Sequence, residues 1–458
     1  MNWNHCFSAK RYGQGSQILD ERSDYERDWD RIIFSSPFRR LQNKTQVFPL
    51  PDDIFVHNRL THSLEVASVG RSLGSLVGEK ISQLSTIKDD AKAVDFYTHH
   101  LKHVIAAGCL AHDLGNPAFG HSGEDAISKY FKKRDTDKKE DLEFKALFTA
   151  DEWNDLTHFE GNANALRILT MQLNGRAKGG FRLTYSTLAS VLKYPCSSSA
   201  TIKKGPVHRK KYGFFQIDQP VFTDIVHTLG MMKDDTTTYT AYKRHPFVYL
   251  VEAADDICYT IIDFEDAHRL GLLSFETVKN AFLDIIKTNS EDDIERVKAT
   301  ADKISEDKNE GIGYLRAKAI NVLTNRCKEV FIEHQDAIIN GQFNSSLIDA
   351  LPELKDAIQY IRTQSIKYIY NAKNVVGLEV AGFRIMSGLV ADFVSAVLTP
   401  IDKREKEQEK LLELLPLQYK VQENGTPYEK VMCMLDFISG MTDNYALKLY
   451  RKLRGIEM

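Results

Sequence analysis

Residues 245–271, HPFVYLVEAADDICYTIIDFEDAHRLG, form a long apolar stretch that constrains the fold more than any other part of the chain. The stretch begins next to a proline, continues through alanines and ends at Gly271. Proline favours the first turn of a helix and glycine favours its C-terminal cap, whereas a strand rarely runs this long. The sequence therefore predicts one long buried helix here.

Other stretches share this helical character. Leucine and alanine recur at steps of three and four over residues 59–77. Apolar helices are also predicted over LKHVIAAGCLAHDLG (101–115), EVAGFRIMSGLVADFVSAVL (379–398) and KVMCMLDFISGMTDNYALKLYRKL (430–453). Strand patterns are few, and the aromatic residues of KKYGFFQID (210–218) predict one short β-hairpin. The predicted fold class is all-α.

The chain has 458 residues, which is more than a single hydrophobic core usually serves. We expect a core that carries the functional site over residues 1–280. A second helical lobe over residues 281–458 is expected to pack on this core and to contribute to contacts between subunits.

Composition excludes several classes of protein. The six cysteines are scattered without a CxxC pair, which is typical of reduced thiols and not of a disulfide scaffold. The first residues lack the apolar core of a signal peptide, and no uninterrupted apolar run reaches membrane-spanning length. The formal net charge of −3 argues against a surface coated with nucleic acid, although it leaves a local basic patch open. We expect a soluble, cytoplasmic protein that does not enter a membrane.

The stretch HDLGNPAFGHSGE (112–124) concentrates ionisable side chains near the end of a predicted helix. His112 and Asp113 lie about 100° apart around a helix axis, so both can reach one point in front of that end. Upstream, His62 lies on a predicted amphipathic helix, with Arg59 three residues earlier on the same face.

A second set of polar side chains lies within the apolar stretch that ends at Gly271. Asp255, Tyr259 and Asp263 follow one another at steps of four, so they share one face of the predicted helix. Carboxylates in so apolar a helix are costly to bury unless they are paired or bind a metal. Two imidazoles and two carboxylates from three helices suit a divalent ion such as Mn²⁺, Fe²⁺, Co²⁺, Ni²⁺ or Zn²⁺.

The order of these motifs resembles that of the deoxyguanosinetriphosphate triphosphohydrolase (dGTPase) family of HD-domain phosphohydrolases. The resemblance extends from about residue 25 to residue 450 and rests on six phrases in order: FRRLQNKTQVF, NRLTHSLEVASVGR, HDLGNPAFGHSGE, FEGNANALRIL, HPFVYLVEAADDICY and FISGMTDNYA. It implies an HD-domain helical fold. It also implies hydrolysis of a deoxynucleoside triphosphate, dGTP above all, to the deoxynucleoside and inorganic triphosphate by water attack at the α-phosphorus.

The resemblance implies a metal site formed by His62, His112, Asp113 and Asp255, with Mn²⁺ or Mg²⁺ as the expected ion. Many HD phosphohydrolases have a histidine where this chain has Asn116, and this departure leaves the four ligands intact.

The resemblance also assigns to His121 the proton that the leaving group needs. Glu124, three positions on, orients this imidazole and tunes its pKa.

The substrate contacts implied by the resemblance begin with the sugar. Gln46 and Asp263 are expected at the 3′-hydroxyl, with Tyr259 packed under the deoxyribose so that a 2′-hydroxyl would collide with its ring. The remaining expected contacts are Arg59, Asn162, Lys211 and Arg384. Three basic residues near Lys211 are equally good candidates for binding the phosphates: Lys193, Lys204 and Arg209.

Other interpretations stay open at this point. Tyr259 could be an ordinary core residue, and an ion pair with Glu379 or Asp392 would explain Arg384 equally well. The chain could be a sensor that responds to nucleotides or single-stranded DNA with little turnover, or another HD nucleotide phosphohydrolase. The full ligand set and the pair of His121 and Glu124 favour the enzyme.

A homo-oligomer, with a hexamer as one option, and an effector dNTP or single-stranded DNA are expected partners.

Overall fold

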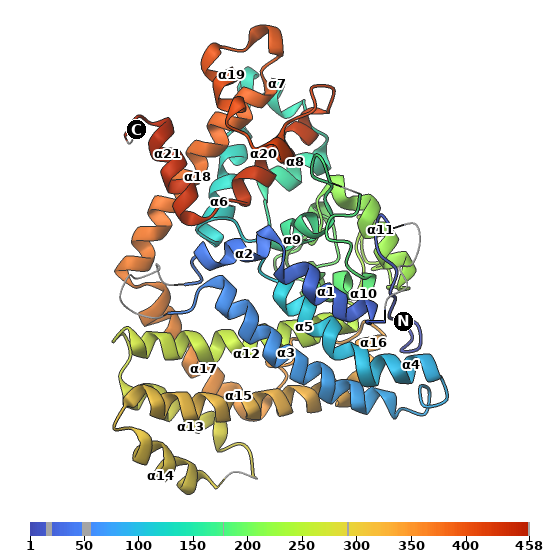
Figure 1. Ribbon diagram of the computed structural model, residues 1–458, viewed down its shortest axis with the longest axis vertical. Coiled ribbons are helices and arrows are strands. Elements are labelled where there is room, and N and C mark those ends of the chain that lie inside the picture. Colours follow the sequence, from blue (N-terminus) through green and yellow to red (C-terminus); the bar gives the residue numbers. More distant parts are fainter. Residues whose placement is uncertain (15–20, 48–55, 177, 291–292, 457–458) are drawn as a thin grey trace.

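The structure is a computed structural model that describes residues 1–14, 21–47, 56–176, 178–290 and 293–456 (Figure 1). Within these ranges the chain is built of helices, and its extended segments form only isolated β-bridges. The predicted all-α class is confirmed.

The hairpin predicted over residues 210–218 is wrong, because this segment forms no ladder with another strand. Its aromatic side chains pack against other aromatic rings instead. Phe214 stacks on Phe222 with ring centroids 4.0 Å apart, and Phe215 meets Phe159 at 5.5 Å. Aromatic residues that favour a pleated surface therefore serve here to pack a loop onto the core.

Two hydrophobic cores divide the helices into two sets, which we call the lower and the upper lobe after the place of most of their helices in Figure 1; α11 belongs to the lower lobe by its core residues but is drawn as high as α6. The lower lobe contains α1 (Asp24–Ile33), α2 (Ser36–Arg40), α3 (Arg59–Ser82), α4 (Ala91–Asp95), α5 (Leu101–Ala111), α10 (Tyr185–Val191), α11 (Gln219–Thr228), α12 (Pro246–Arg269), α13 (Phe275–Ile286), α14 (Ile294–Ile304), α15 (Lys308–Glu333), α16 (Gln335–Ile339) and α17 (Lys355–Gln364). The upper lobe contains α6 (His121–Lys132), α7 (Lys139–Lys145), α8 (Ala150–Thr157), α18 (Lys373–Leu398), α19 (Lys406–Glu413), α20 (Pro427–Ser439) and α21 (Asp443–Leu453), and α9 (Gly161–Thr170) lies between the lobes.

The long apolar helix predicted over residues 245–271 is α12. It begins as expected, because the His245 side chain caps the backbone N–H of Phe247 and Pro246 occupies the first turn. It ends at Arg269, and Gly271 follows with a φ of +70° that a glycine adopts without strain. The helix packs against α3, α5 and α15 in the middle of the lower lobe.

Small residues bring α3 and α5 close together in the lower lobe. A Cβ atom at Gly70 would lie 2.4 Å from the Sγ of Cys109, and one at Gly78 would lie 2.1 Å from the carbonyl oxygen of Tyr97, in the π-helical turn Phe96–His100 that leads into α5. Glycine is thus required at both positions of α3. The close packing fixes the start of α3 relative to the C-terminal end of α5.

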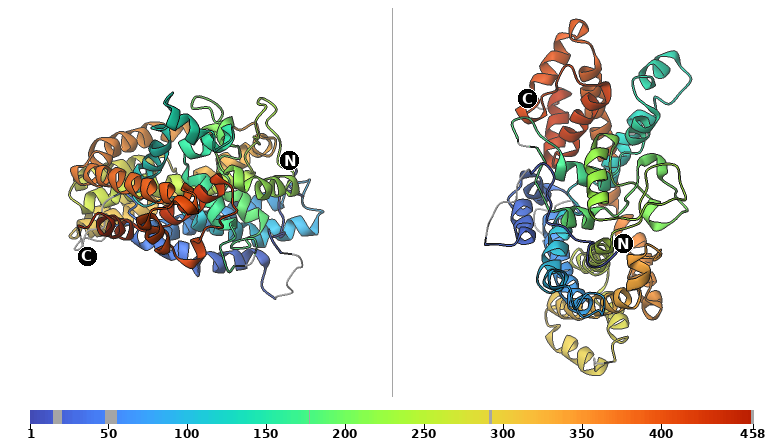
Figure 2. Two further views of the ribbon diagram at one scale, coloured as in Figure 1. Left: turned by 90° about the horizontal axis from the view of Figure 1, so that it is seen from above. Right: turned by 90° about the vertical axis from the view of Figure 1, so that its right-hand side faces the viewer.

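The upper lobe is built around α18, which packs against α6 and α20, and the side view in Figure 2 separates this lobe from the lower one. By length and composition alone, the part of α18 over Val375–Leu398 could cross a membrane, and half of its most apolar window is buried inside the protein. Arg384 and Asp392 interrupt its apolar sequence. Apolar core helices also meet this criterion, so the feature is weak evidence of a membrane span.

The stretch 430–453, predicted as one helix, is two helices. The first helix, α20, ends at Ser439. The Thr442 side chain caps the second helix, α21, by accepting a hydrogen bond from the Tyr445 N–H. Gly440 and the capping threonine together outweigh the apolar periodicity that runs through this stretch.

Helices from both sides of residue 280 contribute to each hydrophobic core. The division into a core over residues 1–280 and a lobe over 281–458 stays a prediction.

Candidate active site

Three helices bring the predicted metal ligands together near the junction of the lobes. His62 lies in the second turn of α3, His112 ends α5 and is followed by Asp113, and Asp255 lies on α12. One donor atom each from His62, His112 and Asp113 lies within 4.8 Å of the others, a spacing that could hold a metal ion. The Oδ1 atom of Asp255 is 3.1 Å from His62 Nε2 and 3.4 Å from His112 Nε2.

The hydrogen bonds of His112 suit a metal ligand. Its Nδ1 donates to the carbonyl oxygen of Cys109 at 2.6 Å, which leaves the lone pair on Nε2. That nitrogen faces the carboxylate oxygens of Asp255 at 3.4 Å and Asp113 at 3.8 Å. Acceptors that face one another need a cation between them. His62, His112 and Asp113 could therefore hold a divalent ion, and Asp255 lies against both imidazoles of this cluster.

The pKa values of this cluster agree with a site that favours positive charge. Burial would lower the pKa of His112, but the carboxylates of Asp255 and Asp113 outweigh it and raise this pKa to about 9. Burial would also raise the pKa of Asp255, yet the imidazoles of His112 and His62 hold it well below its usual range. Both carboxylates are thus available as anionic ligands near neutral pH.

Asp113 is held at both oxygens. The Arg59 guanidinium donates to Asp113 Oδ2 at 2.7 Å, and the Asn116 carboxamide donates to Oδ1. Burial opposes ionisation of Asp113, but the positive charge of Arg59 lowers its pKa below the usual value. The residue that departs from the common HD pattern thus orients a predicted ligand.

His121 begins α6, and its ring pairs with the carboxylate of Glu124. Its Nδ1 lies 3.0 Å from Glu124 Oε2, while Glu124 Oε1 accepts the backbone N–H of Gly161 at 3.1 Å. This hydrogen bond raises the pKa of His121 above its ordinary value. Burial would raise the pKa of Glu124, yet the bond to His121 lowers it. The pair is suited to hold a proton on the imidazole near neutral pH.

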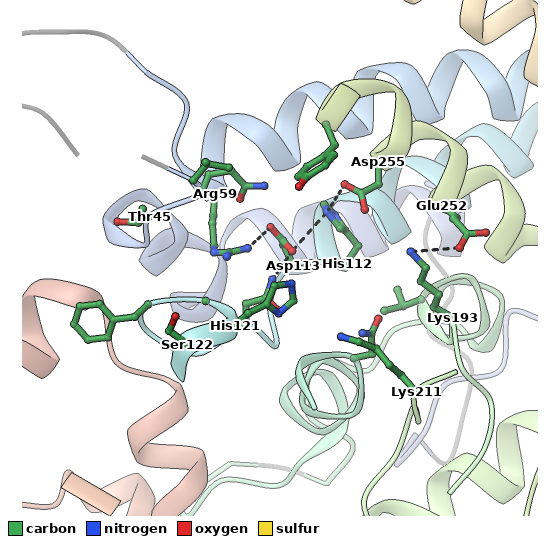
Figure 3. A pocket seen from close by; sticks show the side chains of 18 of the residues that line it. Thr45, Arg59, His112, Asp113, His121, Ser122, Lys193, Lys211, Glu252 and Asp255 are labelled. Carbon is green, nitrogen blue, oxygen red and sulfur yellow. Dashed lines mark hydrogen bonds and ion pairs between the residues drawn. The ribbon is translucent and has the colours of Figure 1, made fainter. Parts of the chain in front are cut away.

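Most of these groups line a cavity of about 500 Å³, which is within the usual range for a ligand site, whereas His62 and Glu124 are not among its described lining residues. Figure 3 shows Arg59, Asp113, His112 and Asp255 along one side and Lys193 and Lys211 on the other. Of the predicted residues, the cavity is lined by Gln46, Arg59, His112, Asp113, His121, Asn162, Lys211, Asp255 and Tyr259.

Asp263 and Arg384 are not among the described lining residues of this cavity. Asp263 is buried behind it and accepts a hydrogen bond of 3.1 Å from the hydroxyl of Tyr370, and burial raises its pKa to about 7. The ring of Tyr370 stacks on Tyr259 at 5.9 Å between centroids. Arg384 is exposed on α18.

Each lysine at the cavity has a glutamate partner. Lys211 donates to Glu160 at 3.0 Å, and Lys193 lies 3.3 Å from Glu252. The predicted Asn162 also donates to Glu160, at 2.7 Å.

Of the other basic candidates, Arg209 is buried and donates to the carbonyl oxygen of Ala200, while Lys204 is exposed. Neither residue is among the described residues that line the cavity.

Sequence reasoning missed several lining residues: Thr45, Phe119, Ser122, Tyr194, Glu252, Tyr370, Val375, Leu378 and Glu379. Thr45, Phe119, Ser122 and Glu252 lie inside the six phrases that carry the family resemblance, and these phrases are the signal that marks them. The residues after 370 belong to ordinary helical sequence, and no local pattern distinguishes them.

Comparison with known proteins adds independent information. Residues 348–452 match a family model described as a phosphohydrolase-associated domain. Over the full length of both chains, the protein is 38% identical to a deoxyguanosinetriphosphate triphosphohydrolase-like protein of Synechocystis sp. and 34% identical to one of Listeria monocytogenes. It is 31% identical to a deoxyguanosinetriphosphate triphosphohydrolase of Yersinia enterocolitica, with 97% of each chain covered. The chain therefore belongs to the deoxyguanosinetriphosphate triphosphohydrolase family of HD-domain phosphohydrolases.

Proposed function

We propose that this chain hydrolyses deoxynucleoside triphosphates, with dGTP as the preferred substrate, to the deoxynucleoside and inorganic triphosphate. The observation that carries the proposal is the group of His62, His112, Asp113 and Asp255 at a nucleotide-sized cavity beside His121. These four side chains would hold the ion, Mn²⁺ or Mg²⁺ first, with Co²⁺, Fe²⁺, Ni²⁺ and Zn²⁺ as alternatives.

The proposed reaction breaks the bond between the α-phosphorus and the 5′-oxygen. When bound, the metal would polarise a phosphoryl oxygen and lower the pKa of water. Water attacks the α-phosphorus, its oxygen stays with the triphosphate, and the proton that it loses passes to solvent. The 5′-oxygen leaves with a proton that His121 donates, while Glu124 orients the ring and stabilises its charged form.

Basic residues around the cavity are proposed to neutralise the triphosphate. Lys211 and Lys193 face the cavity from the side opposite Asp113, and Arg59 borders it next to that carboxylate. The glutamate partners of both lysines keep the cations ordered before substrate arrives.

The deoxyribose is proposed to lie on the Tyr259 ring, with Gln46 and Asn162 also at the cavity. The Oε1 atom of Gln46 is buried without a hydrogen-bond partner among the described residues, as expected of a group that awaits a ligand hydroxyl. Asp263 reaches the 3′-hydroxyl only if the Tyr370 hydroxyl gives up its bond. The exposed position of Arg384 supports a contact with the nucleotide of a neighbouring subunit.

A homo-oligomer, an effector dNTP or single-stranded DNA, and a cytoplasmic location stay predictions. The preference for guanine is proposed from the family.

The test is product analysis with each dNTP singly and with all four together, in the presence of Mn²⁺ or Mg²⁺. We expect deoxynucleoside and triphosphate from dGTP, no turnover after chelation by EDTA, and recovery when Mn²⁺ is restored. In ¹⁸O-labelled water the label should enter the triphosphate; label in the deoxynucleoside would contradict attack at phosphorus.

Variants test the assignment of the ion site. Asp113→Asn should lower kcat by more than about 100-fold, since loss of even an outer partner of a metal ligand costs 10- to 100-fold. Asp125→Asn, an exposed carboxylate on α6, is the matched control. If no dNTP is hydrolysed alone, in mixtures or with single-stranded DNA, the proposed enzymatic function is wrong and the sensor function is favoured.

A further inference from the structure

Asp443 links the C-terminal helices to two distant segments of the chain. It is the first residue of α21, and its side chain is buried. Its Oδ2 accepts the backbone N–H of Thr45 at 2.9 Å, and its Oδ1 accepts the backbone N–H of Phe119 at 3.0 Å. One carboxylate thus joins segments that lie 398 and 324 residues away in sequence.

Both segments carry proposed functional groups. Thr45 immediately precedes Gln46, and Phe119 precedes Gly120 and His121. All five of these residues line the cavity. The carboxylate therefore binds the backbone one residue before Gln46 and two residues before His121, the side chains to which the proposed function assigns the sugar contact and the proton.

The segment before His121 has an unusual backbone that needs support from its surroundings. Phe119 has a φ of +63°, and Gly120 follows with a φ of +57°. Glycine adopts the left-handed region freely, but a phenylalanine is held there only by surrounding contacts. The Phe119 ring supplies one contact, because it packs so closely on α18 that a Cβ at Gly382 would lie 2.7 Å from the Phe119 Cβ.

Lys44 ties the same three segments together. Its buried ammonium donates to the carbonyl oxygen of Asn116 at 2.5 Å and to that of Ser439 at 3.1 Å. Ser439 ends α20, four residues before Asp443. The break between α20 and α21 thus presents one carbonyl and one carboxylate to the loops that border the cavity.

We propose that Asp443 is a positioning residue for the reaction. Its carboxylate holds the backbone at Phe119 so that His121 meets the leaving 5′-oxygen, and it holds the backbone at Thr45 so that Gln46 meets the sugar. The inference rests on the proposed function. It gives α21 a role in the active site that requires no contact between Asp443 and the substrate.

The test compares Asp443→Asn with wild type. A carboxamide has one acceptor oxygen, and its NH₂ group would face one of the two backbone donors. We expect kcat for dGTP to fall about 10- to 100-fold, as for other residues that orient reacting groups, with KM changed by less than about threefold. Glu429→Gln, which removes an acid from the first turn of the neighbouring helix α20, is the control and should leave kcat unchanged.

Hydrogen exchange gives a readout that does not need activity. In Asp443→Asn the amides of peptides over 41–47 and 116–124 should exchange faster, while those over 446–453 in α21 stay as protected as in wild type. A role limited to stabilising α21 would change only the last peptide. An unchanged kcat, or faster exchange confined to α21, would overturn the inference.

Two further outcomes are informative. Should Asp443→Asn not fold, Asp443→Glu keeps the negative charge and displaces the acceptors by one methylene, and the same readouts apply. If wild type hydrolyses no dNTP, the proposed function fails, and the exchange of peptide 116–124 still decides whether Asp443 holds this loop.

Discussion

His121 is the side chain through which pH should act on the proposed reaction. As a proton donor it must be charged, so kcat/KM falls as the pH rises through its pKa. The hydrogen bond to Glu124 raises this pKa above the ordinary value of about 6.5. Glu124→Gln removes the negative charge, so the alkaline limb of the pH profile should move to lower pH and kcat should fall about 10- to 100-fold.

The measurement is kcat/KM from pH 5.5 to 9.5 with product chromatography. The exposed Asp125→Asn variant removes an adjacent carboxylate that does not contact the imidazole and should leave the alkaline limb in place. If the alkaline limb of the kcat/KM profile does not move in Glu124→Gln, a group other than His121 donates the proton to the leaving group.

At the residue scale, the sequence was most informative where chemistry is concentrated in a short phrase. His112, Asp113 and His121 lie within ten positions, so their phrase could be singled out and matched to a family. The bond between Tyr370 and Asp263 joins residues 107 positions apart, and nothing local to either marks it. Nothing local to Arg384 indicates which face of its apolar helix meets solvent.

The start of α3 is fastened to α12 by a buried imidazole. His57 Nδ1 lies 2.8 Å from Asp266 Oδ1, and its Nε2 lies 3.1 Å from Glu65 Oε1. Burial would lower the pKa of His57, but its hydrogen bonds to Asp266 and Glu65 outweigh it and raise this pKa to about 10. Since His62 lies on α3 and Asp255 on α12, this contact fixes the two helices that carry those ligands.

This contact predicts a pH-dependent stability. The folded-state pKa of about 10 exceeds the unfolded value of about 6.5, so the charged imidazole stabilises the fold fully below pH 6.5. That contribution is lost as the pH rises through about 10. The difference in free energy of unfolding between wild type and His57→Gln should therefore be greatest near pH 6 and shrink steadily toward pH 10.

Urea unfolding followed by circular dichroism at pH 6, 8 and 10 measures this difference. His227→Gln, an exposed histidine on α11, controls for the loss of an imidazole as such. A difference between wild type and His57→Gln that stays constant with pH would show that His57 is not charged in the folded protein.

At the scale of elements, capping residues were better predictors than apolar periodicity. Pro246 and Gly271 bracketed α12 to within about two residues, because proline and glycine restrict the backbone locally. Periodicity ran through Gly440 and Thr442 and predicted one helix where two form. Nothing local to Phe214 and Phe215 indicates that these aromatic residues pack on Phe222 and Phe159 instead of forming a strand.

For the whole molecule, the sequence predicted the all-α class but could not specify which helices share a core. The upper core joins Phe131 of α6 with Val390 and Phe393 of α18, segments more than 250 residues apart. Such contacts depend on how the chain returns on itself, which length and composition do not report.

The two lobes should consequently be unable to fold as separate chains. A fragment of residues 1–280 would expose the face of α6 that packs on α18. It would also leave the buried Arg167 without Asp436, whose carboxylate accepts from its guanidinium at 2.6 Å through both oxygens. Breaking a buried pair costs about 3–5 kcal/mol, a large part of the stability of a domain.

We expect fragments 1–280 and 281–458, expressed alone, to aggregate or to unfold without a cooperative transition. Co-expressed, they should form a complex that unfolds cooperatively, because every contact between α6 and α18 and between Arg167 and Asp436 can then form. Circular dichroism melts and analytical ultracentrifugation distinguish these cases. A sharp melting transition for the monomeric fragment 1–280 alone would show that its core is closed without α18, and that Arg167 finds sufficient compensation in Asp218, 3.1 Å away on its own side of residue 280.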